Sequence, residues 1–176
     1  MDIILNRSIE WLDRLIAYDT TSRLSNLDLI SDIEKYMNEL GVPTRLTHDK
    51  DKTKANLWCT IGPQDIGGVV LSGHTDVVPI DGQEWTKTPF KMSEESGKLF
   101  GRGTSDMKGF CAIALAMAPE MKSRDLKVPI HFAFSFDEEV GCVGVRHLIK
   151  DVVDNLPLPR AVIVGEPTSM KIVGGN

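Results

Sequence analysis

The order of apolar and polar residues along the chain predicts helices that alternate with strands. Apolar side chains recur every three or four positions in residues 8–17 and 26–40, which is the spacing of an amphipathic helix. Shorter apolar runs bounded by polar turns are typical of strands. Further helices are predicted at 110–121 and 141–150, and strands at 44–46, 56–61, 69–72, 99–100, 129–136, 161–164 and 171–173.

Single residues predict the ends and the surroundings of two of these helices. Asn26 stands where an N-cap residue is expected for the helix 26–40, and Gly41 follows its last periodic residue, as a C-terminal glycine does. The segment 110–121, "FCAIALAMAPEM", is rich in alanine and apolar nearly all round. We expect it to be buried on most sides.

Strands that alternate with helices indicate an α/β fold. We expect a mostly parallel sheet that helices cover on both faces. In such sheets ligands bind beyond the carboxyl ends of the strands. The polar segment 81–98, which contains Trp85 and Phe90, is expected to run over the surface as an ordered excursion.

Composition narrows the class of protein. The chain has 176 residues, a formal charge of -5 and 41% hydrophobic residues, which fits one globular domain and disfavours a nucleic-acid partner. Three widely spaced cysteines form no disulfide framework and fit a reducing compartment. The first residues hold an acid and too short an apolar run for a signal peptide or a membrane helix. We therefore expect a cytoplasmic protein with no membrane partner.

Acidic residues and one histidine follow several of the predicted strands. His74 and Asp76 come after 69–72, and "DEE" at 137–139 comes after the strand 129–136. Glu166 follows the strand 161–164, and Asp106 precedes the apolar helix. Because the strands end at one edge of the sheet, we expect these groups to meet there. Histidine and carboxylates together suit zinc above all, with cobalt or manganese as alternatives.

Each candidate also has a structural interpretation. His74 is either a metal ligand whose second ring nitrogen is held by Asp76, or a hydrogen-bonding residue of a turn. Asp106 either bridges two cations or caps the helix that follows it. Of the adjacent Glu138 and Glu139, one can bind metal while the other stays free as a general base.

Other titratable residues are expected to serve structure or to face solvent. His131 lies inside a strand, and Cys111 and Cys142 fit packing positions better than nucleophiles. Arg102 and Lys108 flank Asp106, where solvated loop charges are the default and contact with an anionic substrate is the alternative. His48 and His147 are expected at the surface. Nucleotide-binding glycine motifs and the G-x-S-x-G motif of serine hydrolases are absent from the sequence.

Four motifs in this order carry a resemblance to a known family. "SGHTDVVP", "GRGTSDMKG", "DEEVG" and "VGEPTS" resemble the two-zinc amidohydrolases, a zinc-exopeptidase-like family that includes aminoacylases and carboxypeptidase G. The resemblance covers essentially the whole chain. Within the family, "YDTTSRLSN", "DGQEWTKTPF" and "DEEVGCVGVR" look most like members that deacetylate N-acetyl-L-ornithine in arginine biosynthesis. Members that desuccinylate N-succinyl-diaminopimelate are the main alternative.

The resemblance implies a role for each candidate residue. His74 and Glu166 would hold one zinc, Glu139 would hold the other, and Asp106 would bridge them, while cobalt could replace zinc. Glu138 would be the general base, with Asp76 orienting His74. The substrate would be a small N-acylated amino acid. The family pattern also implies a cis peptide bond between Asp106 and Met107 and a supporting hydrogen-bond role for Asp137.

The family pattern extends beyond these 176 residues. Relatives add a further histidine ligand near their C-terminus and a smaller lid domain that mediates dimerisation. We therefore expect residues 1–176 to be the N-terminal portion of the zinc-dependent catalytic domain, inactive alone and homodimeric in its full-length form. A non-catalytic binding or assembly module derived from such an enzyme is the alternative from another class.

Overall fold

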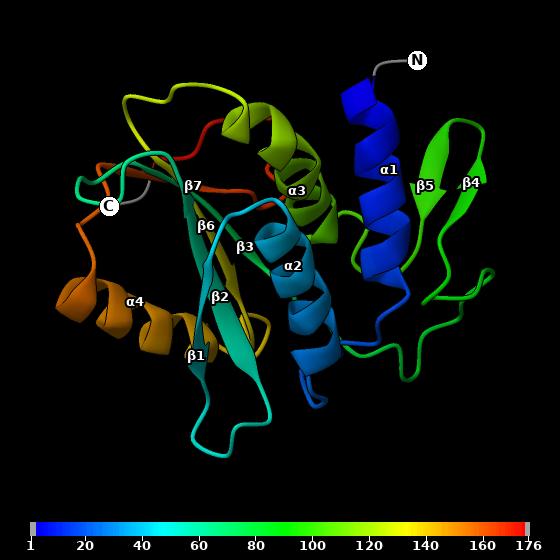
Figure 1. Ribbon diagram of the computed structural model, residues 1–176. Coiled ribbons are helices and arrows are strands. Elements are labelled where there is room, and N and C mark those ends of the chain that lie inside the picture. The colour runs from blue at the N-terminus through cyan, green and yellow to red at the C-terminus, as the bar shows by residue number, and fades with distance from the viewer. Residues whose placement is uncertain (1–2, 175–176) are drawn as a thin grey trace.

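The computed structural model describes residues 3–174 as alternating helices and strands (Figure 1). Most predicted elements are present, with ends that shift by a few residues. The helices are α1 (Ile3–Ile16), α2 (Leu27–Glu39), α3 (Lys108–Lys122) and α4 (Val143–Asn155). The strands are β1 (Thr44–His48), β2 (Ala55–Ile61), β3 (Val69–His74), β4 (Ser93–Glu95), β5 (Lys98–Phe100), β6 (Ile130–Ser135) and β7 (Ala161–Val164).

The central sheet has the strand order β1-β2-β6-β3-β7. β3 pairs in parallel with β6 on one side and with β7 on the other, with Leu71 opposite both Phe132 and Ile163. β2 pairs antiparallel with both β1 and β6. In the described chain, β2 is thus the one strand of this sheet that runs against the others, which confirms the prediction of a mostly parallel sheet.

Helices cover both faces of the sheet (Figure 1). On one face, α2 and α3 pack on the strands and α1 packs on α3, around a core that includes the fully buried Phe132 and Phe134. On the other face, Leu148 and Val152 of α4 pack against Trp58, Val70 and Ala133. The small β4–β5 hairpin lies beside α1; β4 belongs to the predicted excursion 81–98, and β5 contains the strand predicted at 99–100.

The segment around α2 confirms one predicted helix end and corrects the other. Gly41 has a φ of +69°, and the next amide, Val42 N, donates to Met37 O at 2.9 Å, so the predicted C-terminal glycine is confirmed. Asn26 does not cap the helix. Its side chain instead donates to Ala55 O at 2.9 Å and accepts from Ala55 N at 3.0 Å, so it ties the start of α2 to β2.

The strand predicted at 171–173 is wrong. Ser169 and Met170 have positive φ angles, and Lys171 N donates to Thr168 O at 3.2 Å, which closes a turn. The apolar side chains that follow this turn are exposed rather than paired in the sheet. Their apolar pattern alone could not reveal the turn, because the residues that form it carry no glycine or proline at the positive-φ positions.

Candidate metal centre

The carboxyl ends of three neighbouring strands deliver the candidate ligands to one edge of the sheet. His74 is the last residue of β3, so this strand extends two residues beyond its predicted end. Glu138 and Glu139 lie in the loop after β6, and Glu166 comes two residues after β7. Asp106 precedes α3, which packs against β3. The structure therefore brings the predicted site residues together.

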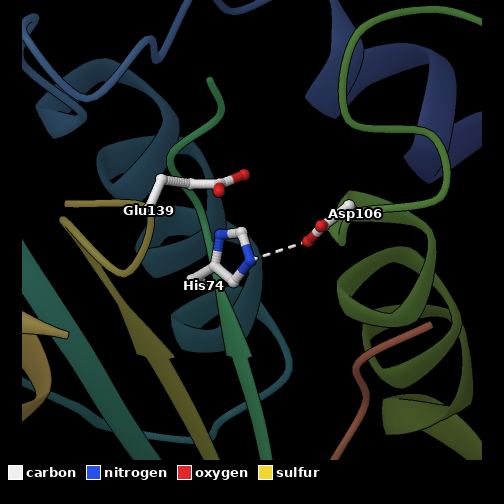
Figure 2. A group of neighbouring side chains, drawn as sticks. All are labelled: His74, Asp106 and Glu139. Carbon is white, nitrogen blue, oxygen red and sulfur yellow. Dashed lines mark hydrogen bonds and ion pairs between the residues drawn. The ribbon is translucent and has the colours of Figure 1, made fainter. Parts of the chain in front are cut away.

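His74 is at the centre of this group. Its imidazole is buried, and Nε2 lies 3.0 Å from Oδ1 of Asp106. The same nitrogen lies 3.6 Å from Oε1 of Glu166 and 3.8 Å from Oε2 of Glu138. Figure 2 shows Asp106 pointing toward the ring of His74, while Glu139 reaches across from the loop after β6. Carboxylates from three separate segments thus converge on one ring nitrogen.

The donor atoms fit a divalent metal ion. Two ligand atoms on one zinc lie at most about 4.4 Å apart, because each bond is about 2.0–2.2 Å long. The distances from His74 Nε2 to Asp106 and Glu166, 3.0 and 3.6 Å, satisfy this limit. Donor atoms within 4.8 Å of one another form two groups, His74 with Asp106 and Glu139, and His74 with Glu138 and Glu166. His74 belongs to both groups, so the division of ligands between two ions stays a prediction.

The second ring nitrogen of His74 is held by the chain itself. Nδ1 lies 2.9 Å from the backbone oxygen of Asp76 and 3.6 Å from its carboxylate oxygen Oδ1. A carbonyl oxygen can only accept, so Nδ1 carries a proton and donates it, which leaves Nε2 of the neutral ring free to bind metal. The partner at hydrogen-bond distance is therefore the backbone of Asp76 rather than its side chain.

The pKa of His74 is shifted by competing effects. Burial favours the neutral ring, but the contacts with Asp76 and the charge of Glu166 outweigh it and raise the pKa to about 9. In the metal-free chain, the surrounding carboxylates thus favour a positive charge at this position. A metal ion would supply that charge in place of the proton.

Two carboxyl groups of the site, those of Glu139 and Glu166, have raised pKa values. Burial and the nearby charge of Asp106 raise the pKa of Glu139 above its ordinary value. Burial also raises the pKa of Glu166, against the opposite effect of the His74 charge, and the charges of Asp106 and Glu138 add to the increase. A cation between these groups would remove the repulsion, which explains how several acids can share one edge of the sheet.

Asp76 organises the loop after β6. Its Oδ1 accepts from Glu138 N at 3.1 Å, and its Oδ2 accepts from Glu139 N at 3.3 Å and from Ser22 Oγ at 2.7 Å. Burial alone would raise the pKa of Asp76, but the contacts with His74, Ser22 and Glu138 lower it instead. Asp76 is therefore a buried carboxylate that connects His74 to the two glutamates.

Two residues beside the site differ from their predicted surroundings. Lys108 is fully buried rather than a solvated loop charge, and its Nζ donates to Leu15 O at 2.9 Å and to Tyr18 O at 2.8 Å. Burial lowers the pKa of Lys108 to about 8. Cys142 is exposed rather than packed. It has a φ of +55°, and its Sγ donates to Glu138 Oε1 at 3.3 Å.

The other titratable residues that were expected in structural or surface positions lie in such positions. His131 is buried within β6, where Nδ1 contacts Thr60 Oγ1 at 2.9 Å and Nε2 accepts from Gly68 N at 3.1 Å. Cys111 is buried, and burial raises the pKa of its thiol to about 12. His48 and His147 are exposed. The peptide bond between Asp106 and Met107 is cis, as predicted.

Residues that the sequence did not single out support the loop 137–139. Asp137 pairs with Lys54, whose Nζ lies 2.5 Å from Oδ1 of Asp137, so the expected supporting role of Asp137 has a named partner. Ser22 and Lys54 carry no local sequence signal of their own, because both act on residues more than 30 positions away.

Several solved structures share this arrangement of helices and strands. The M20 family metallo-carboxypeptidase Sso-CP2 from Sulfolobus solfataricus matches with a TM-score of 0.72 and 24% identity, over 94% of this chain and 37% of that chain. Human carnosine dipeptidase 1 matches with a TM-score of 0.69 and 23% identity, over 92% of this chain and 39% of that chain. At this level of identity the similarity concerns the fold.

Sequence comparison defines the family. Residues 70–174, more than half of the chain, match the model of peptidase family M20/M25/M40, and the chain belongs to this family. Acetylornithine deacetylase from Shigella sonnei is 37% identical over 85% of this chain and 38% of its own length. Acetylornithine deacetylase from Buchnera aphidicola subsp. Schizaphis graminum is 36% identical over 94% of this chain and 44% of its own length. The chain thus spans about two-fifths of the length of these relatives, whose family consists of metal-dependent hydrolases.

A helix that crosses a bilayer must be both long and apolar. Within residues 3–174, no helix meets both conditions for crossing a membrane.

Proposed function

We propose that this chain forms the metal-binding part of a zinc-dependent amidohydrolase that removes the acetyl group from N-acetyl-L-ornithine, a reaction of arginine biosynthesis. The observation that carries the proposal is the buried Nε2 of His74 with three carboxylates 3.0–3.8 Å away. The choice of substrate rests on the two acetylornithine deacetylases that are 37% and 36% identical to the chain. A cytoplasmic location, favoured by the three free cysteines, is part of the proposal.

The proposed ligands meet at the sheet edge, and the family resemblance suggests how they divide between two ions. His74 and Glu166 would hold one zinc ion, Glu139 would hold a second, and Asp106 would bridge the two. Cobalt could take the place of zinc, because the same nitrogen and oxygen ligands suit both ions. When bound, such ions lower the pKa of a water molecule and polarise the carbonyl of an amide.

Glu138 is the proposed general base. Its carboxylate lies beside His74 and is partly exposed, so it can reach both the site and a substrate. It would accept a proton from the attacking water as the new C–O bond forms at the amide carbon. The C–N bond then breaks, and Glu138 would return the proton to the leaving nitrogen. One amide and one water thereby give ornithine and acetate.

Asp76 is proposed to act through its neighbours. It accepts from the backbone N–H groups of Glu138 and Glu139 at 3.1 and 3.3 Å. Its backbone oxygen, 2.9 Å from Nδ1, keeps the ring of His74 in the tautomer that leaves Nε2 free. Asp76 would therefore fix the relative positions of a ligand and the general base.

Residues 1–176 are further proposed to correspond to the N-terminal portion of the catalytic domain. They align with 38% and 44% of the length of the two deacetylases. The second zinc would have Glu139 and the bridging Asp106 as its protein ligands within this chain. Because catalytic zinc sites have three protein ligands, we expect a further ligand from elsewhere and no hydrolysis by this chain alone. From the family resemblance, we also expect the complete protein to form a homodimer.

An assay of hydrolysis tests the proposed function. The complete gene product is incubated with N-acetyl-L-ornithine and, separately, with N-succinyl-diaminopimelate, and the chain 1–176 is measured alongside. The expected result is release of acetate from N-acetyl-L-ornithine at a much higher kcat/KM than release of succinate. A preference for the succinylated substrate, or for other N-acyl amino acids, would assign the protein to another amidohydrolase. Zinc binding without hydrolysis of any of them would favour a non-catalytic module.

A further inference from the structure

Ser22 connects two separate contacts that hold the loop 137–139. Its hydroxyl donates to Oδ2 of Asp76 at 2.7 Å, and its backbone oxygen accepts from Nζ of Lys54 at 2.5 Å. Ser22 is buried, and its backbone N–H donates to Val77 O at 3.1 Å, which fixes it beside β3. One residue from the segment between α1 and α2 thus meets both groups that bind the loop.

The first contact is made by the side chain of Asp76. This carboxylate receives the backbone N–H groups of Glu138 and Glu139, so it constrains the main chain of the loop rather than one side chain. Asp76 is 2% exposed, and a buried carboxylate needs its full set of donors. Among the groups that donate to the carboxylate of Asp76, the hydroxyl of Ser22 is the one that lies outside both β3 and the loop 137–139.

The second contact is the ion pair between Lys54 and Asp137. Nζ of Lys54 lies 2.5 Å from Oδ1 of Asp137, and the two side chains are 14% and 16% exposed. Lys54 immediately precedes β2, so this pair ties the loop to the neighbour of β6 on the side away from β3. A pair this shielded from water holds its geometry better than an exposed one.

These contacts account for how the loop is attached to the rest of the molecule. The other backbone hydrogen bonds of 137–139 run to residues 141–143 and stay within the same turn. Across residues 3–174, the hydrogen bonds from this loop to more distant segments go to Asp76 and Lys54. The positions of the Glu138 and Glu139 carboxylates relative to His74 therefore depend on these two anchors.

We propose that Ser22 and Lys54 are positioning residues that hold the loop 137–139 so that the carboxylates of Glu138 and Glu139 face His74. The inference rests on the proposed function, because it assigns both residues to the same metal centre. Removing either contact would keep every ligand residue in the sequence but would widen the range of positions open to Glu138 and Glu139. Weaker metal binding and a more mobile loop are the consequences.

The experiment compares the chain with two variants and their matched controls. Ser22→Ala removes the hydroxyl and keeps the backbone oxygen, and Ser8→Ala is its control, since Ser8 Oγ donates to Ile4 O at 2.8 Å within α1. Lys54→Met removes the ion pair, and Arg45→Met is its control, since Arg45 pairs with Asp151 between β1 and α4. Lys54→Arg tests rescue by a residue that keeps the charge.

Hydrogen exchange of the metal-free chain measures the loop directly. A lost hydrogen bond corresponds to roughly fivefold faster exchange, and we expect this at the amides of Glu138 and Glu139 in both variants, with amides of β6 unchanged. The controls and Lys54→Arg should match the unmodified chain. Equal exchange in all variants, a uniform increase through β6, or loop amides that are unprotected in the unmodified chain would overturn the inference.

Zinc titration separates this inference from the proposed function. We expect zinc to bind roughly 10-fold more weakly in Ser22→Ala and Lys54→Met, with the controls unchanged. If the unmodified chain binds zinc and the two variants bind it equally well, the positioning role is wrong while the metal centre stands. If the folded chain binds no zinc, the proposed function fails, and the exchange of the loop amides still decides whether Ser22 and Lys54 hold the loop.

Discussion

Oδ1 of Asp106 lies 3.0 Å from Nε2 of His74, although 32 positions separate the two residues in the sequence. His74 ends a central strand, and Asp106 stands before the helix that packs on that strand. Their contact joins the sheet to the helix layer at the edge where Glu138, Glu139 and Glu166 also lie. A buried imidazole beside several carboxylates is an arrangement that a divalent cation stabilises.

Zinc binding should release a proton from His74. The pKa of about 9 in the metal-free chain means that the ring is largely protonated at neutral pH, whereas a metal ligand must be neutral. The apparent affinity should therefore rise with pH, by about tenfold per unit below the pKa, and level off above it. Calorimetry at pH 6.5–8 in buffers of different ionisation enthalpy measures this release. Affinity that does not change with pH would show that His74 gives up no proton to the metal.

Glu138→Gln should separate metal binding from catalysis. Glutamine keeps the size of the side chain and removes the group that accepts the proton, so kcat of the complete gene product should fall by at least about 100-fold. Zinc affinity should stay within a few-fold, because Glu138 is not one of the proposed ligands. The control is Glu120→Gln on α3, where the carboxylate pairs with Arg124. A variant that keeps its kcat would rule out Glu138 as the base.

Lys108 should make stability depend on pH in the alkaline range. Its pKa is about 8 in the folded chain and 10.5 when unperturbed, so the unfolded chain binds more protons between these values. The free energy of unfolding should rise with pH across this window by on the order of 3 kcal/mol relative to Lys108→Met. Urea unfolding of both chains at pH 7.5, 9 and 10 measures the difference. If the difference in the free energy of unfolding stays constant with pH, burial does not lower the pKa of Lys108.

Gly165→Ala should disturb the position of Glu166. A Cβ at residue 165 would lie 2.0–2.4 Å from three ring atoms of Phe110, so the ring or the chain after β7 must move. We expect a loss of stability of about 1–3 kcal/mol and weaker zinc binding. Gly174→Ala is the control, because a Cβ there meets no atom within 4 Å. An unchanged Tm together with unchanged zinc affinity would contradict this packing.

The sequence predicted which segments meet at the site because strand ends share one edge of a sheet. The apolar runs at 69–72, 129–136 and 161–164 are short and bounded by polar residues, so their carboxyl ends could be located without knowing the strand order. The order β1-β2-β6-β3-β7 and the reversed direction of β2 depend on contacts between distant segments. Local patterns carry no information on such contacts.

The surroundings of three residues were misjudged from the sequence. Lys108 was expected in solvent, but its partners are carbonyl oxygens of Leu15 and Tyr18, 93 and 90 positions away. Asn26 fitted an N-cap by position, yet its amide binds β2. Cys142 was expected in the core, but it is exposed at the start of α4, in a left-handed backbone conformation. In each case tertiary contacts or backbone geometry decided the outcome.

The most direct test of the metal centre is a calorimetric titration of zinc into the purified chain, beside His74→Ala and a His48→Ala control on the exposed histidine of β1. We predict one tight zinc in the unmodified chain and in His48→Ala, and its loss in His74→Ala, with circular dichroism showing all three folded. A folded chain that binds no zinc, or zinc binding that survives His74→Ala unchanged, would contradict the assignment of this site as a metal centre.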